Sequence, residues 1–412
     1  MHEEKLRKRN FRALTFEGSF FFAGLSFIDM NAVIPVFIFA YTQSVLLAGL
    51  ATTINFAASI TMQTIVGPYV RGIKNKPRYI TLIMALFRPL PFLMIPVLFA
   101  GFNPWLTTGI FLIIYTLSFA GNGMIEIPWT DLFGRTIQQE KRGLLLGYQQ
   151  LIGGLGALLA GYIVKFILDN PNLNNDQRYA IIFGCSALAL SLSVVSMSFA
   201  RDLPHKIETR KTSNWHYYRK LPYYLRKNKI FSKLALVRIF ASIAIMIAPF
   251  VILFGEKVMN LAAEDVSTLV FLQIAGGLIG GIIWGKISGR FGNHRVILAS
   301  QYLSFLIACF AIFLFIFSSS GFPSFILWPL VLINGINMGS WLGFLNYTID
   351  IVDEDERTIY LLISNLITFP FVFLPFLAGV IAEYFSYLPI FIISGLAALA
   401  AIAVSRLLKQ SL

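Results

Sequence analysis

The segment GKISGRFGNHR, residues 285–295, follows an apolar run and resembles an earlier segment, GPYVRGIKNKPR, residues 67–78. Both segments begin with glycine and carry several basic residues. Three pairs of glycines keep one spacing of 218 residues: Gly67 and Gly285, Gly121 and Gly339, and Gly161 and Gly379. This shared spacing predicts a chain built from two halves with the same order of elements.

The composition around these segments is that of a membrane protein. Hydrophobic residues make up 57% of the 412 residues and charged residues only 13%, and the mean hydropathy is +0.73. Soluble domains carry about 25% charged residues. Because about 20 apolar residues suffice for a helix to cross the hydrocarbon core, twelve spans are predicted. They cover residues 17–40, 45–70, 79–100, 105–131, 143–167, 178–200, 234–254, 266–287, 296–317, 325–349, 358–382 and 387–407.

The basic residues gather on alternate connections between these spans. Of 33 Lys and Arg, 28 fall in the amino-terminal arm, the tail and every second loop, and ten of them lie within residues 201–233. By the positive-inside rule, this asymmetry predicts a multi-pass protein of the cell membrane with both termini in the cytoplasm. The net charge of +13 therefore orients the chain in the bilayer and does not indicate nucleic-acid binding.

The long polar segment at residues 201–233 divides the spans six and six. We expect a six-helix bundle over residues 1–200, a basic cytoplasmic linker over 201–233 and a second six-helix bundle over 234–412. The expected fold is an all-α membrane protein with two pseudo-symmetric bundles, present as a monomer in the lipid bilayer.

With this layout, the chain resembles the major facilitator superfamily of secondary transporters. The family signature after spans two and eight reads Gly-x-x-x-Asp-Arg/Lys-x-Gly-Arg/Lys. The second copy matches at Gly285, Arg290 and Gly292, with Gly289 at the acidic position, whereas the first copy has Arg71 at that position. The resemblance implies the twelve-helix fold, transport by alternating access, and a latch formed by these loops at the cytoplasmic ends of the two halves.

Because both copies lack the acid, other residues are expected to complete the cytoplasmic gate. The acidic cluster at residues 350–357 offers partners, and so does Asp131 near Arg135 and Arg142. The predicted gate comprises Arg71, Asp131, Arg142, Arg290, Asp350 and Arg357.

Two patterns of the family's proton-coupled drug exporters are missing from the sequence. Such exporters usually carry an arginine four residues before a glycine in span four, where this chain has Leu117 before Gly121. They also carry Gly-Pro-x-x-Gly-Gly in span five, where Ala157 replaces the proline. Both departures argue against a typical drug antiporter.

Polar residues follow single faces of three spans that line the central cavity in the resembled fold. Spacings of three and four residues place side chains on one face of a helix. The stripes are Ser19, Phe22, Ser26 and Asp29 in span one, Ser118, Asn122, Glu126 and Trp129 in span four, and Asn334, Asn337 and Trp341 in span ten. Hydrogen bonding to neighbouring helices is the alternative for a single Asn or Ser, but three aligned stripes favour a cavity. The predicted substrate cavity comprises Ser26, Asn122, Gln149, Asn334, Asn337 and Trp341.

Three charged residues inside apolar spans are candidates for a proton or substrate pathway: Asp29, Arg88 and Glu126. Burial disfavours the charged form of a carboxyl group, so Asp29 either exchanges a proton or belongs to a permanent ion pair. An unpaired charge in a dry environment is costly, so Arg88, within ALFRPLPFLMIP at 85–96, is expected to pair with Asp29 or Glu126. The prolines of that segment are expected to bend the span. In span eight, Gly277, Gly281 and Gly285 predict close helix packing.

The sequence offers no enzyme signature. GGIIWGKI at 280–287 lacks the Ser or Thr that a phosphate loop needs for magnesium, and the four His are too scattered to suggest a metal site. We therefore expect no enzymatic activity and no cofactor. The leading interpretation is a secondary carrier for a small organic solute, with a proton as the candidate coupling ion. An exporter of lipids or amphipathic drugs and a non-transporting receptor or scaffold are the alternatives.

Overall fold

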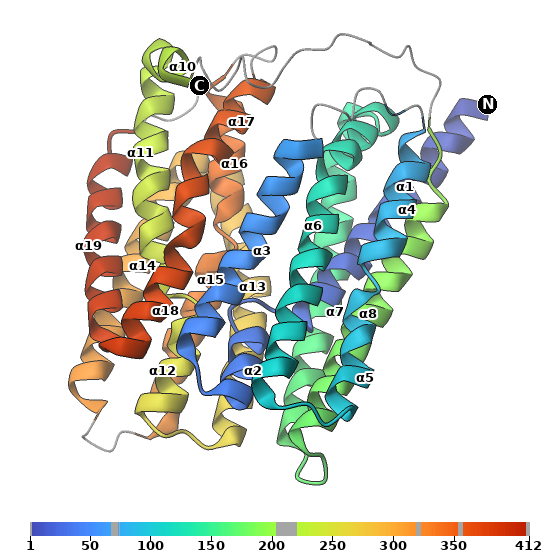
Figure 1. The fold of residues 1–412 in the computed structure, drawn as a ribbon. Helices are drawn as coiled ribbons and strands as arrows, with labels where there is room; N and C mark the ends of the chain where they lie inside the picture. Colours follow the sequence, from blue (N-terminus) through green and yellow to red (C-terminus); the bar gives the residue numbers. More distant parts are fainter. Residues whose placement is uncertain are drawn as a thin grey trace. The chain divides into compact units, whose positions relative to one another are not determined.

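The computed structural model describes residues 2–66, 73, 75–202, 221–318, 323–352 and 357–408. Within these ranges the chain is helical, without a β-strand (Figure 1). Eleven helical segments of the described chain are long and apolar enough to cross a membrane, and the shorter apolar helix α2 (Val33–Thr42) adds one more. The predicted all-α membrane fold is confirmed.

Contacts between residues divide the chain into two compact units. Unit 1 comprises Met1–Asp29, Ala40–Thr42 and Ile54–Thr212, and unit 2 comprises Met30–Phe39, Gln43–Thr53 and Ser213–Leu412. The first half of α3 (Val45–Val66) therefore belongs to unit 2 and the second half to unit 1. Most of the predicted linker lies outside the described residues, and its last part forms α10 (Leu221–Lys227) and the first turn of the helix that begins at Lys229.

Six helices complete unit 1 around a small apolar core. They are α1 (His2–Ser26), α4 (Lys76–Phe87), α5 (Met94–Phe99), α6 (Pro104–Thr136), α7 (Gln139–Asp169) and α8 (Asn175–Ser198). Leu14, Ile80, Leu132 and Leu145 are fully buried in this core and come from α1, α4, α6 and α7. Burial of apolar side chains between these helices holds the unit together and fixes which faces are left for polar residues.

The first predicted span is not one helix. Helix α1 ends at Ser26, α2 begins at Val33, and Asp29 lies in the non-helical connection. Asp and Asn side chains compete with the backbone for hydrogen bonds, which disfavours a helix through the segment DMN. The prediction of a continuous helix over residues 17–40 is therefore wrong at this point. Irregular backbone at membrane depth is tolerated where it is buried in protein or lines a cavity.

The third span bends as its prolines predict. Helix α4 ends at Phe87, the 3₁₀ turn η2 spans Leu90–Leu93, and α5 begins at Met94. Proline has no backbone N–H to donate and clashes with the preceding turn, so Pro89 and Pro91 end the regular helix. Arg88 is the C-cap residue of α4, and Pro89 separates it from η2.

Unit 2 contains most of α2, the first half of α3, α10 and nine further helices of the described chain. They are α11 (Lys229–Ala244), α12 (Phe250–Val258), α13 (Ala263–Phe291), α14 (Asn293–Ile316), α15 (Leu327–Met338), α16 (Trp341–Asp350), α17 (Arg357–Thr368), α18 (Leu374–Tyr384) and α19 (Leu388–Ser405). Span ten is divided at Gly339 and Ser340, between α15 and α16.

Helices α13 and α15 approach each other through glycines. A Cβ atom added to Gly280 would lie 2.3 Å from the backbone oxygen of Ile336, and one on Gly335 would lie 2.3 Å from that of Gln273. The Trp284 indole donates to the Ile336 oxygen at 2.7 Å and fixes this contact. A Cβ on Gly285, by contrast, would meet no atom within 4 Å. Span eight therefore packs closely against a neighbouring helix. It does so through the face of Gly276 and Gly280, next to the predicted face of Gly277, Gly281 and Gly285.

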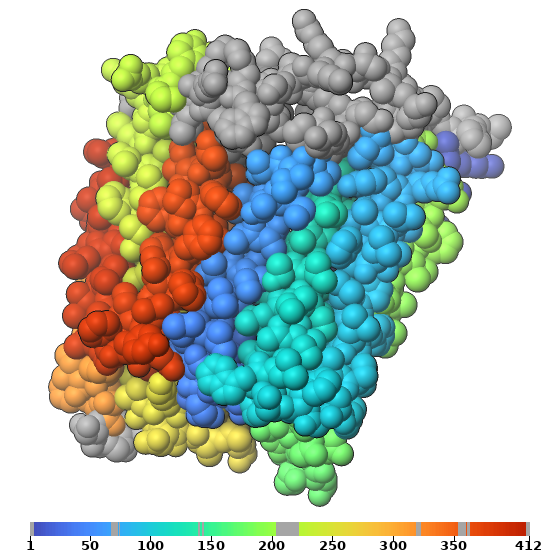
Figure 2. All heavy atoms as spheres, viewed as in Figure 1, coloured from blue at the N-terminus to red at the C-terminus, as the bar shows by residue number. Residues whose placement is uncertain are grey.

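Also within unit 2, the first half of α3 packs against α18, as Figure 2 shows by the contact between their blue and orange-red side chains. A Cβ on Gly49 would lie 2.2 Å from the Pro375 backbone oxygen. The Glu383 carboxylate accepts a hydrogen bond of 2.8 Å from the backbone N–H of Val45, at the start of α3. A carboxylate stabilises a helix N-terminus, where backbone N–H groups lack partners within the helix.

Candidate functional site

A buried charge cluster joins four helices of unit 1. The Arg88 guanidinium pairs with the Glu17 carboxylate of α1 at 2.8 Å, and the two side chains are 5% and 3% exposed. Arg88 also donates to the Ser193 hydroxyl of α8, and its guanidinium lies 4.4 Å from the centre of the Phe21 ring. The Trp129 indole of α6 donates to the other Glu17 oxygen at 2.9 Å.

Glu17 is thus the partner of Arg88, and the prediction of a pair with Asp29 or Glu126 is wrong. Asp29 follows Glu17 by twelve residues, about 18 Å along an ideal helix, so one arginine cannot serve both. Glu17 lies at the edge of the first apolar run. At such a position the sequence does not predict whether an acidic side chain is exposed or buried. Because both charges are neutralised and deeply buried, the pair is suited to holding α1, α4, α6 and α8 together.

Asp29, at the break in the first span, lies within electrostatic range of the Tyr115 hydroxyl of α6. The Asn55 amide of α3 donates to that hydroxyl at 3.1 Å, and Tyr115 is almost fully buried. A tyrosine hydroxyl both accepts and donates, so Tyr115 can accept from Asn55 while its own proton is offered elsewhere. The break in the span therefore leaves a carboxyl group within electrostatic range of a buried hydrogen-bonding network.

A polar ladder continues from this network between α3 and α6. Ser59 donates to the Phe119 backbone oxygen at 3.0 Å, and the Gln63 amide donates to the Glu126 carboxylate. Asn55, Ser59 and Gln63 are spaced four apart and so share one face of α3. This stripe in span two is visible in the sequence, but our sequence analysis did not identify it.

Glu126 is exposed although it lies inside an apolar span, and Asn122 on the same stripe is partly buried. The Asn122 amide oxygen is buried and, among the described residues, accepts no hydrogen bond. Trp129 turns instead to Glu17, and Ser118 donates to the Ile114 backbone oxygen of its own helix. The predicted stripe of span four thus divides into groups used for packing and two residues, Asn122 and Glu126, with capacity for further polar contacts.

Two other predicted cavity residues of unit 1 make local contacts. The Gln149 amide donates to the Leu14 backbone oxygen at 2.6 Å, and its side chain fills the space that the absent side chain of Gly18 leaves open. The Ser26 hydroxyl donates to the Phe22 backbone oxygen one turn earlier. Gln149 thus holds α7 close to α1.

The predicted cavity residues of span ten differ in exposure. The Asn334 amide donates to the Ala248 backbone oxygen and to the Gln273 side chain, both at 3.2 Å. The Asn337 amide donates to Ser304 at 2.8 Å, whereas Trp341 is 58% exposed. Both asparagines are buried and bond to neighbouring helices, and Trp341 presents an exposed ring.

One predicted gate residue of unit 1, Asp131, belongs to a network of ion pairs. Asp131 pairs with Lys76 and, at 2.9 Å, with Arg135, and Arg135 lies 3.2 Å from Asp202. The network joins the start of α4, the end of α6 and the chain beyond α8. Arg71 lies outside the described residues, and so does the side chain of Arg142.

In unit 2, two predicted gate residues are described. The Asp350 carboxylate accepts from the Asn293 amide at 2.7 Å, and the Asn293 oxygen accepts from Ser288 at 2.6 Å. The Arg290 guanidinium lies 5.2 Å from the centre of the Phe291 ring. The side chain of Arg357 lies outside the described residues.

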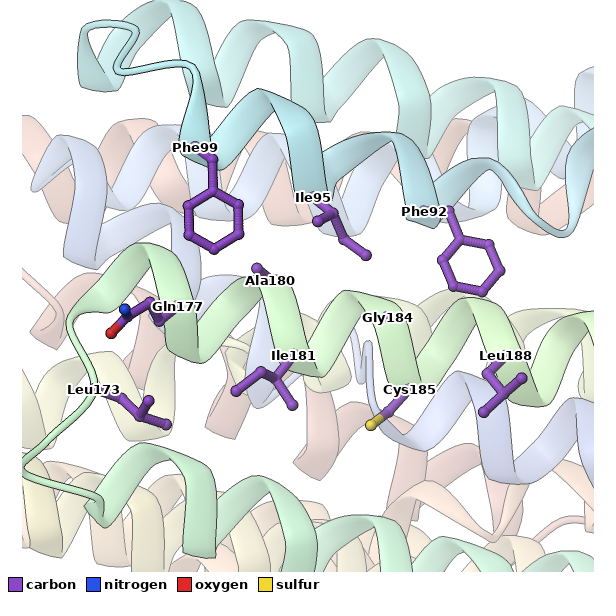
Figure 3. A pocket seen from close by; sticks show the side chains of 10 residues that line it. All are labelled: Phe92, Ile95, Phe99, Leu173, Gln177, Ala180, Ile181, Gly184, Cys185 and Leu188. Carbon is purple, nitrogen blue, oxygen red and sulfur yellow. The ribbon is translucent and has the colours of Figure 1, made fainter.

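An apolar groove of about 540 Å³ lies on the surface of unit 1, apart from these polar groups. Figure 3 shows Phe92, Ile95 and Phe99 pointing from η2 and α5 towards α8. The other lining residues are Leu173, Gln177, Ala180, Ile181, Gly184, Cys185 and Leu188. The groove contains none of the predicted site residues, and its lining resembles the apolar surface expected of a membrane-spanning helix.

Comparison with known proteins identifies the family. The sequence profile of the Major Facilitator Superfamily matches residues 18–369. A search of curated protein sequences gives no match.

Solved structures of low sequence identity share the fold. A D-xylose–proton symporter has a TM-score of 0.72 and 13% identity, with 98% of this chain and 99% of that one covered. A bacterial homologue of the iron transporter ferroportin, in its inward-facing state, has a TM-score of 0.67 and 14% identity, with 98% of each chain covered. A nucleoside transporter has a TM-score of 0.66 and 12% identity, with 98% of this chain and 100% of that one covered. Because the family profile spans most of its length, this chain belongs to the Major Facilitator Superfamily.

Proposed function

We propose that the chain is a secondary carrier of the cell membrane that moves a small organic solute by alternating access, driven by a proton gradient. The observation that supports coupling is the interrupted first span, in which Asp29 lies in non-helical backbone within electrostatic range of the Tyr115 hydroxyl. In transporters, discontinuous helices at membrane depth typically form ion and substrate sites. An ionisable residue within a span is also a functional candidate, because a charged group is costly inside the membrane.

Glu126 is the second proposed proton acceptor. The residue is exposed within an apolar helix, and its carboxylate receives a hydrogen bond from Gln63. Arg88, by contrast, is neutralised by Glu17, so we assign it to the scaffold and not to the pathway. The family fold and the transport named for the compared structures, of xylose with protons and of nucleosides, support a carrier role.

Transport by reconstituted protein tests this proposal. Proteoliposomes on a solid-supported membrane are exposed to a panel of organic solutes with and without an inward proton gradient, and charge movement is recorded. Wild type is expected to give solute-dependent currents that the proton gradient increases. Asp29→Asn is expected to keep solute binding but lose the dependence on the gradient, and Glu126→Gln to reduce it.

Asp169→Asn is the matched control, because Asp169 forms a partly exposed i,i+4 pair with Lys165 at the end of α7. Pairs at i,i+4 on a helix contribute only about 0.3–0.5 kcal/mol to stability. Full gradient dependence in both Asp29→Asn and Glu126→Gln would exclude these carboxylates from coupling. Currents for lipids or hydrophobic dyes alone would favour the exporter alternative, and solute binding without any flux would favour a receptor.

A further inference from the structure

Unit 2 holds a second arginine within a membrane-spanning segment, and its surroundings differ from those of Arg88. Arg238 is partly buried in α11, ten residues into the apolar segment that begins at Lys229. Its guanidinium donates to the Ser364 hydroxyl of α17 and lies 5.9 Å from the centre of the Phe344 ring of α16. Three helices thus converge on one cationic group.

Within the part of the chain that the structure describes, no carboxylate lies within 4 Å of Arg238. A guanidinium carries five N–H donors, and the bond to Ser364 uses one of them. A cation that is removed from water without a partner is strongly disfavoured, so such groups in membrane spans pair or serve a function. Arg88 shows the paired case in the same chain, because Glu17 neutralises it.

The helices that carry Arg238, Ser364 and Phe344 pack against one another through aromatic residues. Phe231 lies two turns earlier on α11 and packs against Tyr360 of α17, with ring centres 4.7 Å apart. Tyr347, one turn after Phe344 on α16, is fully buried in the same apolar cluster. This packing fixes the helix faces that carry Arg238, Ser364 and Phe344, so the guanidinium is held in place without an ion pair.

The charge is not part of the duplicated scaffold. At the repeat spacing of 218 residues, the counterparts of Arg238 and Ser364 are Phe20 and Leu146, neither of which is polar. The other half has no guanidinium–hydroxyl pair at these equivalent positions, so a pair at this place is not needed to build a bundle of this type.

We infer that Arg238 and Ser364 form a binding site for the carboxylate of an organic anion, with Phe344 contacting an apolar part of the same molecule. A planar guanidinium binds a carboxylate through two parallel hydrogen bonds, and a nearby hydroxyl can donate a third. The inference rests on the proposed carrier function, because it assigns the class of solute carried.

Ligand-induced stabilisation of the purified full-length protein tests the site. The probe is sodium benzoate at tens of millimolar, with benzamide as its neutral analogue and inorganic phosphate as a second anion. A site of this size binds a simple carboxylate with a Kd of about 1 mM, so benzoate is expected to raise the melting temperature by about 2 °C. Benzamide is expected to have no such effect.

Three variants assign the effect to the guanidinium. Arg238→Gln is expected to abolish the benzoate shift and Arg238→Lys to reduce it. The control Arg406→Gln, which removes an arginine just beyond α19 that contacts Tyr302, is expected to keep the full shift. An equal response to benzamide, a response to phosphate alone, no response to benzoate, or an undiminished benzoate shift in Arg238→Gln would overturn the inference.

Stability without ligand gives an independent readout. Arg238→Gln removes a charge that no described carboxylate balances, so its melting temperature is expected to equal or exceed that of wild type, whereas Arg88→Gln is expected to melt earlier. A fall in Arg238→Gln as large as that in Arg88→Gln would show that a protein acid holds Arg238, and would contradict the anion site. Benzoate binding without any solute flux would instead refute the carrier function and leave the anion site standing.

Discussion

Removal of either member of the Glu17–Arg88 pair should strongly destabilise unit 1. In Glu17→Gln the Arg88 guanidinium keeps its charge but loses its counter-ion. In Arg88→Met the Glu17 carboxylate keeps its charge and loses its counter-ion. Both side chains are at least 95% buried and their charged atoms are 2.8 Å apart, so the remaining charge cannot reach water. Breaking a buried pair in this way costs about 3–5 kcal/mol. With about 2 cal/mol/K of unfolding entropy per residue, that cost lowers the melting temperature by about 3–6 °C.

The double variant Glu17→Gln with Arg88→Met separates this pair from a general packing defect. It removes both charges together, and the glutamine still offers an oxygen to the Trp129 indole. Replacing a buried ion pair by neutral groups of similar volume is often close to neutral. The double variant should therefore melt nearer to wild type than either single variant does. Thermal unfolding in detergent, followed by tryptophan fluorescence, measures all three variants.

Additive losses would refute this reasoning. If the double variant lost as much stability as the two single variants combined, the two side chains would not interact, and the burial of the pair would have to be reconsidered.

Two further predictions concern helix contacts in unit 2. Gly280→Val should lower the melting temperature well below that of the control Gly285→Val. A Cβ at Gly280 would overlap the Ile336 backbone oxygen, whereas one at Gly285 meets no atom within 4 Å. Equal melting temperatures of the two variants would contradict the close approach of α13 and α15. Glu383→Ala should lose about 1 kcal/mol of stability, since it removes the acceptor for the Val45 N–H, whereas Glu383→Gln should lose less because it keeps an acceptor. Chemical unfolding of both variants measures the difference. The Glu383 carboxylate also lies 3.8 Å from the Lys257 ammonium, so equal losses would assign the effect to the charge and this pair.

The membrane fold was predictable because it depends on averages over long segments. Hydropathy over about 20 residues identifies a span whatever its neighbours do, and the glycine spacing of 218 residues suggested the repeat. The break at Asp29 was not predictable in this way, since six irregular residues hardly change the average of a window three times as long. The face of span eight that packs was also missed, because glycines at positions 276, 277, 280, 281 and 285 offer two faces with similar spacing.

The partners of charged side chains were the least predictable feature. The sequence showed that Arg88 needs a counter-ion, but the choice among Glu17, Asp29 and Glu126 depends on which helix faces which. That arrangement follows from tertiary packing and leaves no local pattern. The Asn55, Ser59 and Gln63 stripe did have a pattern, and attention to polar residues in every span would have identified it.

The assignment of residues 30–39 and 43–53 to unit 2 has a consequence for splitting the protein. A cut between residues 203 and 220 would yield two fragments, and the carboxy-terminal one would lack the segment that covers Pro375, Gly379 and Glu383. Expressed alone, that fragment would expose this surface of α18 to lipid or to other chains, and it should be prone to aggregation. Co-expression with the amino-terminal fragment should rescue it, because complementation in trans would restore the missing cover.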